Sequence, residues 1–177
     1  MPGGGKTTVG RQLARRLNVP FFDTDELIRQ EVGCSISQFF EVEGESRFRD
    51  VESEVLRKLL TPSSPKGQVV ATGGGIVLRE RNRSLLREVA VPIYLRAGPE
   101  ELFRRVRHDT RRPLLQVRDP LGKLHELLNS RDPLYRATAH FVIETGRPSV
   151  STLVNLILMQ LELGGLVDPG AVGSSIS

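Results

Sequence analysis

The feature that most constrains the fold is a glycine run that leads into a helix near the start of the chain. Gly3-Gly4-Gly5-Lys6-Thr7 precedes residues 8–17, where apolar side chains recur at helical spacing and arginines occupy the other side. This is the second half of the phosphate-binding motif G-x-x-x-x-G-K-[ST]. The alternative, a flexible tag-like N-terminus, does not account for an amphipathic helix that begins immediately. The sequence therefore predicts a nucleotide phosphate site.

Each residue type in this loop has an expected role. The glycines allow backbone N–H groups to curl around phosphate oxygens, and the helix N-terminus adds positive potential. We expect Lys6 to reach the β- and γ-phosphates and the Thr7 hydroxyl to hold Mg²⁺. Thr8 joins the three glycines, Lys6 and Thr7 in the predicted ATP-binding set.

The spacing of the motif also carries an expectation about where the domain begins. The first glycine of the motif belongs six residues before Lys6, upstream of Met1, and the strand that delivers the loop belongs earlier still. In a doubly wound sheet that strand is central, so roughly five apolar side chains at ~1.5–3 kcal/mol each would be absent. We expect a truncated domain with Met1 inside the loop, and an intact mass of the native protein would test this.

Short apolar runs alternate with longer amphipathic segments through the rest of the chain. Strands are expected at 20–23, 68–72, 91–96 and 141–144, and helices at 26–32, 35–42, 46–60, 80–89, 99–107, 121–139 and 149–163. We expect Asp25 to cap the first of these helices and Pro133 to break the helix that contains it. The alternation predicts an α/β fold with a doubly wound parallel sheet flanked by helices. Residues 1–163 form the expected domain and 164–177 a disordered tail.

Composition narrows the class of protein. One cysteine, Cys34, cannot form an intramolecular disulfide, which favours a reducing, cytoplasmic location. No apolar run approaches the ~18 residues that span a bilayer, so no membrane partner is expected. The net charge of +4 comes from basic residues that are interleaved with acidic ones. This pattern is typical of a solvated surface and does not favour a nucleic-acid partner.

Two polar segments follow predicted strands. Asp23-Thr24-Asp25 ends the first strand, and Thr72-Gly73-Gly74-Gly75 follows the second. Because ligands bind at the carboxyl ends of strands in open α/β sheets, we expect one carboxylate to order water on Mg²⁺ and the other to meet a substrate hydroxyl. The alternative is that Asp25 only caps a helix and Asp23 lies in a turn. The glycines allow a ligand close to the backbone, or form a plain sharp turn.

Arginines supply the remaining candidates. Arg49 opens a predicted helix, where a guanidinium suits bidentate contact with a carboxylate, although a solvated role is the usual one for such a residue. Residues 104–118 are rich in arginine around Pro113-Leu114-Leu115. Such a segment is typical of a mobile cover that brings positive charge over a transferred phosphate.

Taken in order over residues 1–163, these motifs resemble those of the shikimate kinase family. The resemblance implies that Asp23 lies near Mg²⁺ and that Asp25 binds the shikimate hydroxyls and orients or deprotonates the attacking oxygen. The family's Gly-Glu-x-x-Phe-Arg is present at residues 44–49. It implies that Arg49 holds the shikimate carboxylate, with Phe40 and Phe48 on the apolar side of the pocket.

The resemblance assigns the other candidates as well. It places Gly73, Gly74 and Gly75 beside shikimate, and it makes Arg131 the second arginine on the substrate carboxylate through Arg131-Asp132-Pro133-Leu134-Tyr135. A lid at about 107–120, with the motif Arg112-Pro113-Leu114-Leu115, implies that Arg112 reaches the transferred phosphate. Arg105 matches the adenine-stacking arginine, and Arg147 falls in the adenine-binding loop.

The implied protein is a monomeric P-loop kinase with a five-stranded sheet, a helical substrate-binding segment and a mobile lid. The implied reaction is Mg²⁺-dependent transfer of the ATP γ-phosphate to the 3-hydroxyl of shikimate in chorismate biosynthesis, with Lys6, Asp25 and Arg112 as catalytic residues. The alternatives are a catalytically impaired nucleotide-binding relative and a gluconate or nucleoside monophosphate kinase. Neither of these kinases explains Asp-x-Asp, Phe-Arg and the glycine triplet together. The missing strand bears on the activity of this polypeptide and not on its ancestry.

Overall fold

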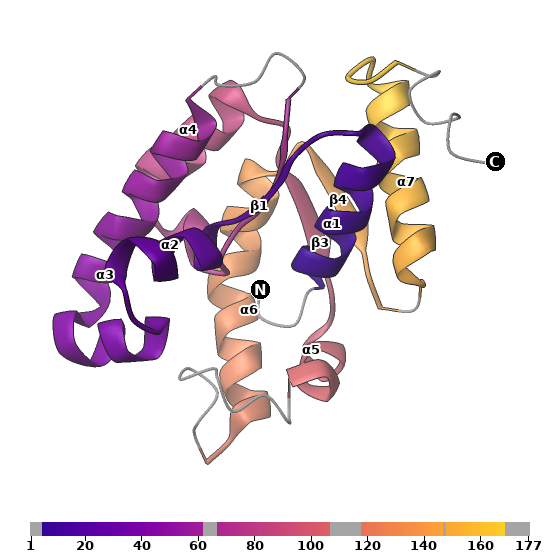
Figure 1. Ribbon diagram of the computed structural model, residues 1–177. Helices are drawn as coiled ribbons and strands as arrows, with labels where there is room; N and C mark the ends of the chain where they lie inside the picture. Colours follow the sequence, from indigo (N-terminus) through magenta and orange to yellow (C-terminus); the bar gives the residue numbers. More distant parts are fainter. Residues whose placement is uncertain (1–4, 62–66, 107–117, 147, 169–177) are drawn as a thin grey trace.

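The computed structural model describes residues 5–61, 67–106, 118–146 and 148–168 (Figure 1). Helices and strands alternate along these residues in the order α1 (Lys6–Leu17), β1 (Phe21–Asp23), α2 (Thr24–Val32), α3 (Ile36–Leu60), β2 (Val69–Ala71), the 3₁₀ turn η1 (Ile76–Leu78), α4 (Glu80–Val89), β3 (Ile93–Arg96), α5 (Pro99–Val106), α6 (Pro120–Thr138), β4 (Phe141–Glu144) and α7 (Val150–Leu163). All four predicted strands are present, each within two residues of the expected bounds.

The strands are parallel and lie in two pairs. β1 pairs with β2, with Asp23 opposite Ala71, and β3 pairs with β4, with Ile93 opposite Phe141. In Figure 1, α1 and α7 lie together on one side of the strands, and α2, α3 and α4 lie on the other. The predicted α/β class with parallel strands and flanking helices is confirmed. Within the described ranges, no backbone ladder joins β2 to β3.

The core is divided between the two faces of the strands. Alternate residues of β3 pack into different clusters, because Ile93 and Leu95 contact the cluster of α1 and α7 while Tyr94 belongs to the cluster of α3, α4 and α6. The first cluster contains Val9, Leu13, Leu153, Val154, Ile157 and Leu158; the second contains Leu56, Leu86, Leu102, Leu124 and Tyr135. A strand with apolar neighbours on both faces is typical of a parallel sheet.

Local signals in the sequence fix several helix ends. Gly33 ends α2 in the left-handed conformation, and Ser149 caps α7. At the start of α3, the Ser35 hydroxyl accepts a hydrogen bond from the Gln38 N–H while the Gln38 side chain accepts one from the Ser35 N–H, which makes a capping box.

Two local predictions are wrong. Asp25 does not cap α2: the helix begins two residues earlier than expected, at Thr24, and Asp23 caps it by accepting from the Asp25 N–H. Pro133 does not break its helix, since α6 continues through it and buries Leu128, Arg131 and Tyr135 around it. This tertiary packing outweighs the loss of one backbone hydrogen bond. The two helices expected at 35–42 and 46–60 are both present within α3, and they meet at a kink at Gly44, whose φ of 79° and ψ of 170° are not helical.

Of the expected tail, residues 164–168 form a turn held to α7 by backbone bonds such as Leu166 N–H to the Leu161 carbonyl, and the others lie outside the described residues.

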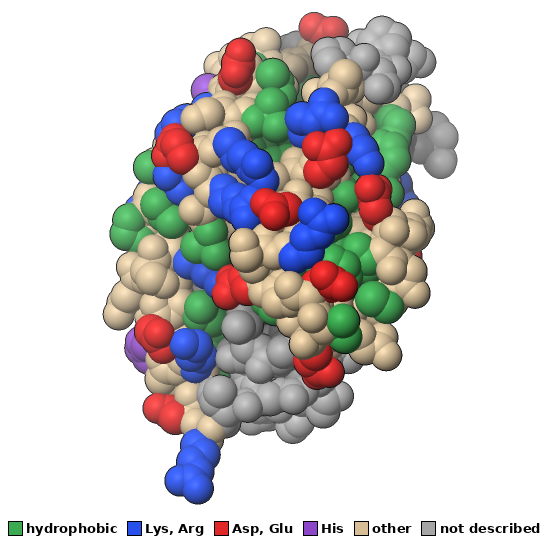
Figure 2. Space-filling model, turned by 90° about the vertical axis from the view of Figure 1, so that its left-hand side faces the viewer, with side chains coloured by type: hydrophobic (Ala, Val, Ile, Leu, Met, Phe, Trp, Pro, Cys, Tyr) green, Lys and Arg blue, Asp and Glu red, His purple; other side chains and the backbone are tan. Residues whose placement is uncertain are grey.

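On the face that carries α3 and α4, Lys and Arg side chains alternate with Asp and Glu (Figure 2). Among the described residues, no helix is both long and apolar enough to cross a bilayer.

The capping box gives a test of the fold. We expect Ser35→Ala to lower the free energy of unfolding by about 1 kcal/mol, because the Gln38 N–H in the first turn of α3 loses its ordered partner. Urea denaturation followed by circular dichroism measures this. Ser151→Ala, at an exposed position in the first turn of α7, is the matched control and should change the value by less than about 0.5 kcal/mol. Equal values for the two variants would contradict the capping assignment.

Candidate active site

The start of α1 meets the end of β1. Gly5 precedes the helix with φ at 73°, a conformation that glycine adopts readily, and Lys6 is the first helical residue. The Thr7 hydroxyl donates to Asp23 Oδ2 at 2.8 Å. The loop threonine and the first carboxylate, both predicted to lie near Mg²⁺, are therefore in direct contact. Thr8 is exposed beside them, and Gly3 and Gly4 lie outside the described residues.

The donor set at this point fits a hard divalent cation. A hydroxyl and a carboxylate supply oxygen ligands, which Mg²⁺ prefers, and Mg²⁺ commonly completes its shell with water and substrate phosphates. Within the described ranges, no group of three or more His, Cys, Asp or Glu side chains forms a cage that would hold a metal ion without such help. Thr7 and Asp23 are thus the residues that would hold Mg²⁺ together with a nucleotide.

The glycine triplet is packed against charged side chains. The Gly73 N–H donates to Thr24 Oγ1 at 3.0 Å, which ties the end of β2 to the start of α2. A Cβ at Gly73 would lie 2.8 Å from Asp25 Oδ1 and 3.2 Å from Glu52 Oε1, and one at Gly75 would overlap the Arg49 guanidinium. A side chain at Gly73 or Gly75 would have to displace these groups, so the two glycines mark the place where a carboxylate and a guanidinium approach the backbone.

Arg49 is held on one side of this glycine turn. It comes from α3, just beyond the kink, and its side chain is buried. Its Nη1 donates to Glu52 Oε2 at 2.8 Å. The rings of Phe40 and Phe48 lie 4.5 Å apart, and the Arg49 guanidinium lies over the Phe48 ring at 5.1 Å. The predicted apolar wall and the predicted carboxylate-binding arginine are therefore neighbours.

Arg131 approaches the same turn from α6. Its Nη1 donates to the Gly74 carbonyl at 3.0 Å, and the Tyr135 hydroxyl donates to the same oxygen. Burial lowers the pKa of Arg131, and the nearby charge of Arg49 lowers it further. Because Gly74 offers only a neutral carbonyl, an anionic ligand that meets both guanidinium groups would be bound strongly.

Sequence reasoning missed two acidic residues, one that holds Arg49 and one that joins α6 to β3. Glu52 is only 1% exposed, and burial raises its pKa even though Arg49 opposes the shift. Its place three residues after Arg49 on a helix was the available signal. Asp132 accepts from the Tyr94 hydroxyl at 2.9 Å and from Arg96 Nε at 3.1 Å, which ties α6 to β3. Nothing in its sequence neighbourhood indicates that role.

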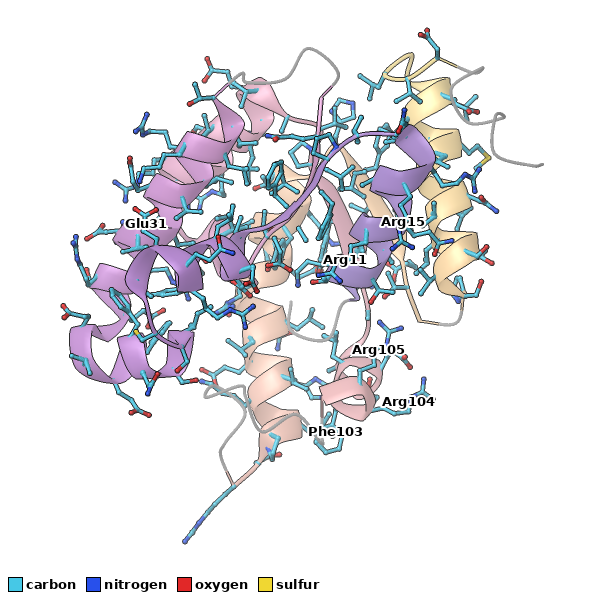
Figure 3. The ribbon with its side chains drawn as sticks, viewed as in Figure 1. Arg11, Arg15, Glu31, Phe103, Arg104 and Arg105 are labelled. Carbon is cyan, nitrogen blue, oxygen red and sulfur yellow. The ribbon has the colours of Figure 1, made fainter. Side chains whose placement is uncertain are left out.

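Of the three arginines predicted to contact ATP, only Arg105 lies within the described residues. Arg105 comes from α5 (Figure 3), where its Nε donates to Glu101 Oε1 at 2.8 Å and its Nη2 to the Thr145 carbonyl at 2.7 Å. It thus links α5 to the segment after β4, which leads to Arg147 and the expected adenine-binding loop. Arg112, Arg147 and residues 107–117 of the expected lid lie outside the described residues.

A glycine loop that opens a helix, a Thr–Asp pair beside it and charged groups at the carboxyl ends of parallel strands define a P-loop kinase. The family model described as "Shikimate kinase" matches residues 2–162. The chain belongs to the shikimate kinase family.

Individual relatives agree with this assignment. The chain is 54% identical to a shikimate kinase of Ralstonia nicotianae over 175 residues, 99% of this chain and 90% of that protein. It is 55% identical to one of Paracidovorax citrulli over 170 residues, 96% and 92% of the two chains. The structure of a shikimate kinase from Acinetobacter baumannii in complex with shikimate superposes with a TM-score of 0.88 at 41% identity, covering 94% of this chain and 92% of that one.

The raised pKa of Glu52 predicts a pH effect on stability. The folded state holds this proton to a higher pH than the unfolded chain, so the contribution of Glu52 is largest below its ordinary pKa of 4.5 and declines as pH rises toward the folded-state pKa. The free energy of unfolding of the wild type minus that of Glu52→Gln should therefore fall with pH above 4.5. Urea denaturation at a series of pH values measures it.

Glu54→Gln is the matched control on the same helix. The hydrogen bond from Arg57 lowers the pKa of Glu54, so this carboxylate stabilises the fold above its ordinary pKa and loses that contribution as pH falls below 4.5. The corresponding difference should rise with pH. If the two differences in the free energy of unfolding changed with pH in the same direction, the assignment of Glu52 as a carboxyl group whose pKa is raised by burial would be contradicted.

Proposed function

We propose that this protein transfers the γ-phosphoryl group of ATP to the 3-hydroxyl of shikimate. The observation that carries the proposal is the approach of Arg49 and Arg131 to the glycine turn that also contacts Asp25. Two guanidinium groups suit a carboxylate, and a neighbouring carboxylate suits a hydroxyl, so the turn can receive a small hydroxy acid in one orientation.

Phosphoryl transfer asks a protein mainly for alignment and charge stabilisation. Arg49 and Arg131 would hold the substrate carboxylate, and Asp25 would orient the attacking hydroxyl and accept its proton. Lys6, at the start of α1, would neutralise the β- and γ-phosphates. Arg112 would add positive charge over the transferred group, and Arg105 would contact the adenine. Glu52 fixes Arg49 by a buried ion pair, which reduces the cost of ordering that side chain when substrate binds.

Mg²⁺ is proposed as the metal of this reaction, held by the Thr7 hydroxyl and, through water, by Asp23. When bound, it supplies charge neutralisation across the β- and γ-phosphates. The contact between Thr7 and Asp23 keeps both oxygens near the phosphate loop before nucleotide arrives.

The proposal extends to the setting of the reaction. We place the enzyme in the cytoplasm as a monomer that serves chorismate biosynthesis. The free thiol of Cys34 and the alternating charges on the α3 and α4 face support this setting. A catalytically impaired relative is not favoured, because Lys6, Thr7 and Asp25 retain the chemistry that the reaction needs.

The substrate arginines give a kinetic test. We expect Arg49→Ala and Arg131→Ala each to raise the KM for shikimate by roughly 10- to 100-fold, because each removes a charge-assisted contact worth about 1.5–3 kcal/mol. The KM for ATP should change little. Steady-state kinetics with each substrate varied measures both constants.

Arg57→Ala is the control for this test, since Arg57 is exposed on the same helix as Arg49 and pairs with Glu54. It should leave both KM values unchanged. Equal losses for shikimate and ATP in the Arg49 and Arg131 variants would argue against the carboxylate assignment. Arg49→Lys keeps the charge without the planar fork and should fall between the wild type and Arg49→Ala.

The metal assignment is tested at Thr7. Thr7→Val keeps the shape of the side chain and removes the hydroxyl, so it should raise the Mg²⁺ concentration needed for half-maximal activity, whereas Thr7→Ser keeps the hydroxyl and should not. Activity measured against Mg²⁺ at fixed ATP separates the two. An unchanged Mg²⁺ requirement in Thr7→Val would contradict the role of Thr7.

A further inference from the structure

The Arg49 side chain meets two carboxylates of its own helix. Glu45 and Glu52 lie four residues before and three residues after it on α3, so the three side chains share one face of the helix. Glu52 accepts from Nη1 at 2.8 Å and its side chain is 1% exposed, whereas the side chain of Glu45 is 60% exposed. The two acidic residues therefore hold different parts of the guanidinium, one inside the protein and one at its surface.

Glu45 occupies the edge of Arg49 that suits a ligand. A single oxygen, Glu45 Oε1, accepts from Arg49 Nε at 3.4 Å and from Nη2 at 3.3 Å. Two such donors form a planar fork that binds a carboxylate through two parallel hydrogen bonds of about 2.7–2.9 Å. Because one oxygen at a longer distance serves both donors, a carboxylate that presents two oxygens would bind this edge better than Glu45 does.

The charge of Glu45 also acts on the second arginine of the site. Burial lowers the pKa of Arg131, and the negative charge of Glu45 opposes that shift. Glu45 therefore lies close enough to influence both guanidinium groups that are proposed to hold the substrate carboxylate. A substrate carboxylate would compete with Glu45 for the same positive charges.

We propose that Glu45 takes the place of the substrate carboxylate in the free protein, and that the acceptor binds by displacing it from the Nε and Nη2 edge of Arg49. The inference rests on the proposed function, since shikimate carries the displacing carboxylate. Because Glu45 is exposed, its side chain passes into water at little cost, while Glu52 keeps its hold on Nη1. An acceptor without a carboxylate does not displace Glu45, so this residue contributes to the selection of hydroxy acids.

The sign of the change in affinity tests this role. Glu45→Gln should lower the Kd for shikimate roughly two- to five-fold, because the competing ion pair is exposed and therefore weak. If Glu45 only supported Arg49, the same variant would raise the Kd. Glu43→Gln makes the same change of charge at an exposed position two residues earlier and should leave the Kd unchanged. Isothermal titration calorimetry on the full chain measures the Kd, and steady-state kinetics should show the effect in KM rather than in kcat.

The methyl ester of shikimate separates competition for Arg49 from a general effect on the site. The ester keeps the hydroxyls but carries no negative charge, so Glu45→Gln should not lower its Kd, and the preference for the acid over the ester should rise roughly two- to five-fold. An unchanged or raised Kd for shikimate, or an equal fall for both ligands, would overturn the inference and leave the proposed function standing. If the unsubstituted chain neither bound nor phosphorylated shikimate, the proposed function would fall and this inference with it.

Discussion

The parallel register of β1 and β2 is the constraint on which the site depends. With Asp23 opposite Ala71, both strands end at the same edge, so Asp25, two residues after β1, meets the glycine triplet after β2. The Gly73 N–H completes this junction by donating to Thr24 Oγ1. A slip of one residue would turn the side chains of β1 to the opposite faces and separate Thr7 from Asp23. The sheet thus fixes the distance between the phosphate end of the site and its acceptor end.

Buried charge is the second constraint, and it explains why the acceptor end is built from glycine and arginine. Removing one partner of a buried ion pair commonly costs about 3–5 kcal/mol, so Arg49 and Glu52 are held together before any ligand arrives. Arg131 reaches the same turn from α6 and donates one hydrogen bond to the Gly74 carbonyl. The fold therefore holds both guanidinium groups in place, so the proposed substrate carboxylate would meet side chains that are already ordered.

Most of the fold and the main site residues could be predicted because they rest on local patterns. The glycine loop, the strands and the Ser35 cap each have a signature within a few residues. What could not be predicted depends on tertiary contacts: α6 continues through Pro133 because its buried face is packed, and Asp132 matters because Tyr94 and Arg96 come to it from β3. Glu52 lies between these cases, since its spacing from Arg49 was visible but its burial was not.

The central claim is that the two arginines, Asp25 and the glycine turn select shikimate as the phosphoryl acceptor. The most direct measurement is ADP release, coupled to a spectrophotometric readout, with this chain, ATP and Mg²⁺ in the presence of shikimate, gluconate or a nucleoside monophosphate. The account predicts acceptor-dependent ADP release with shikimate and only background release with the other two. Faster release with gluconate or a nucleoside monophosphate than with shikimate, or release that no acceptor stimulates, would contradict it.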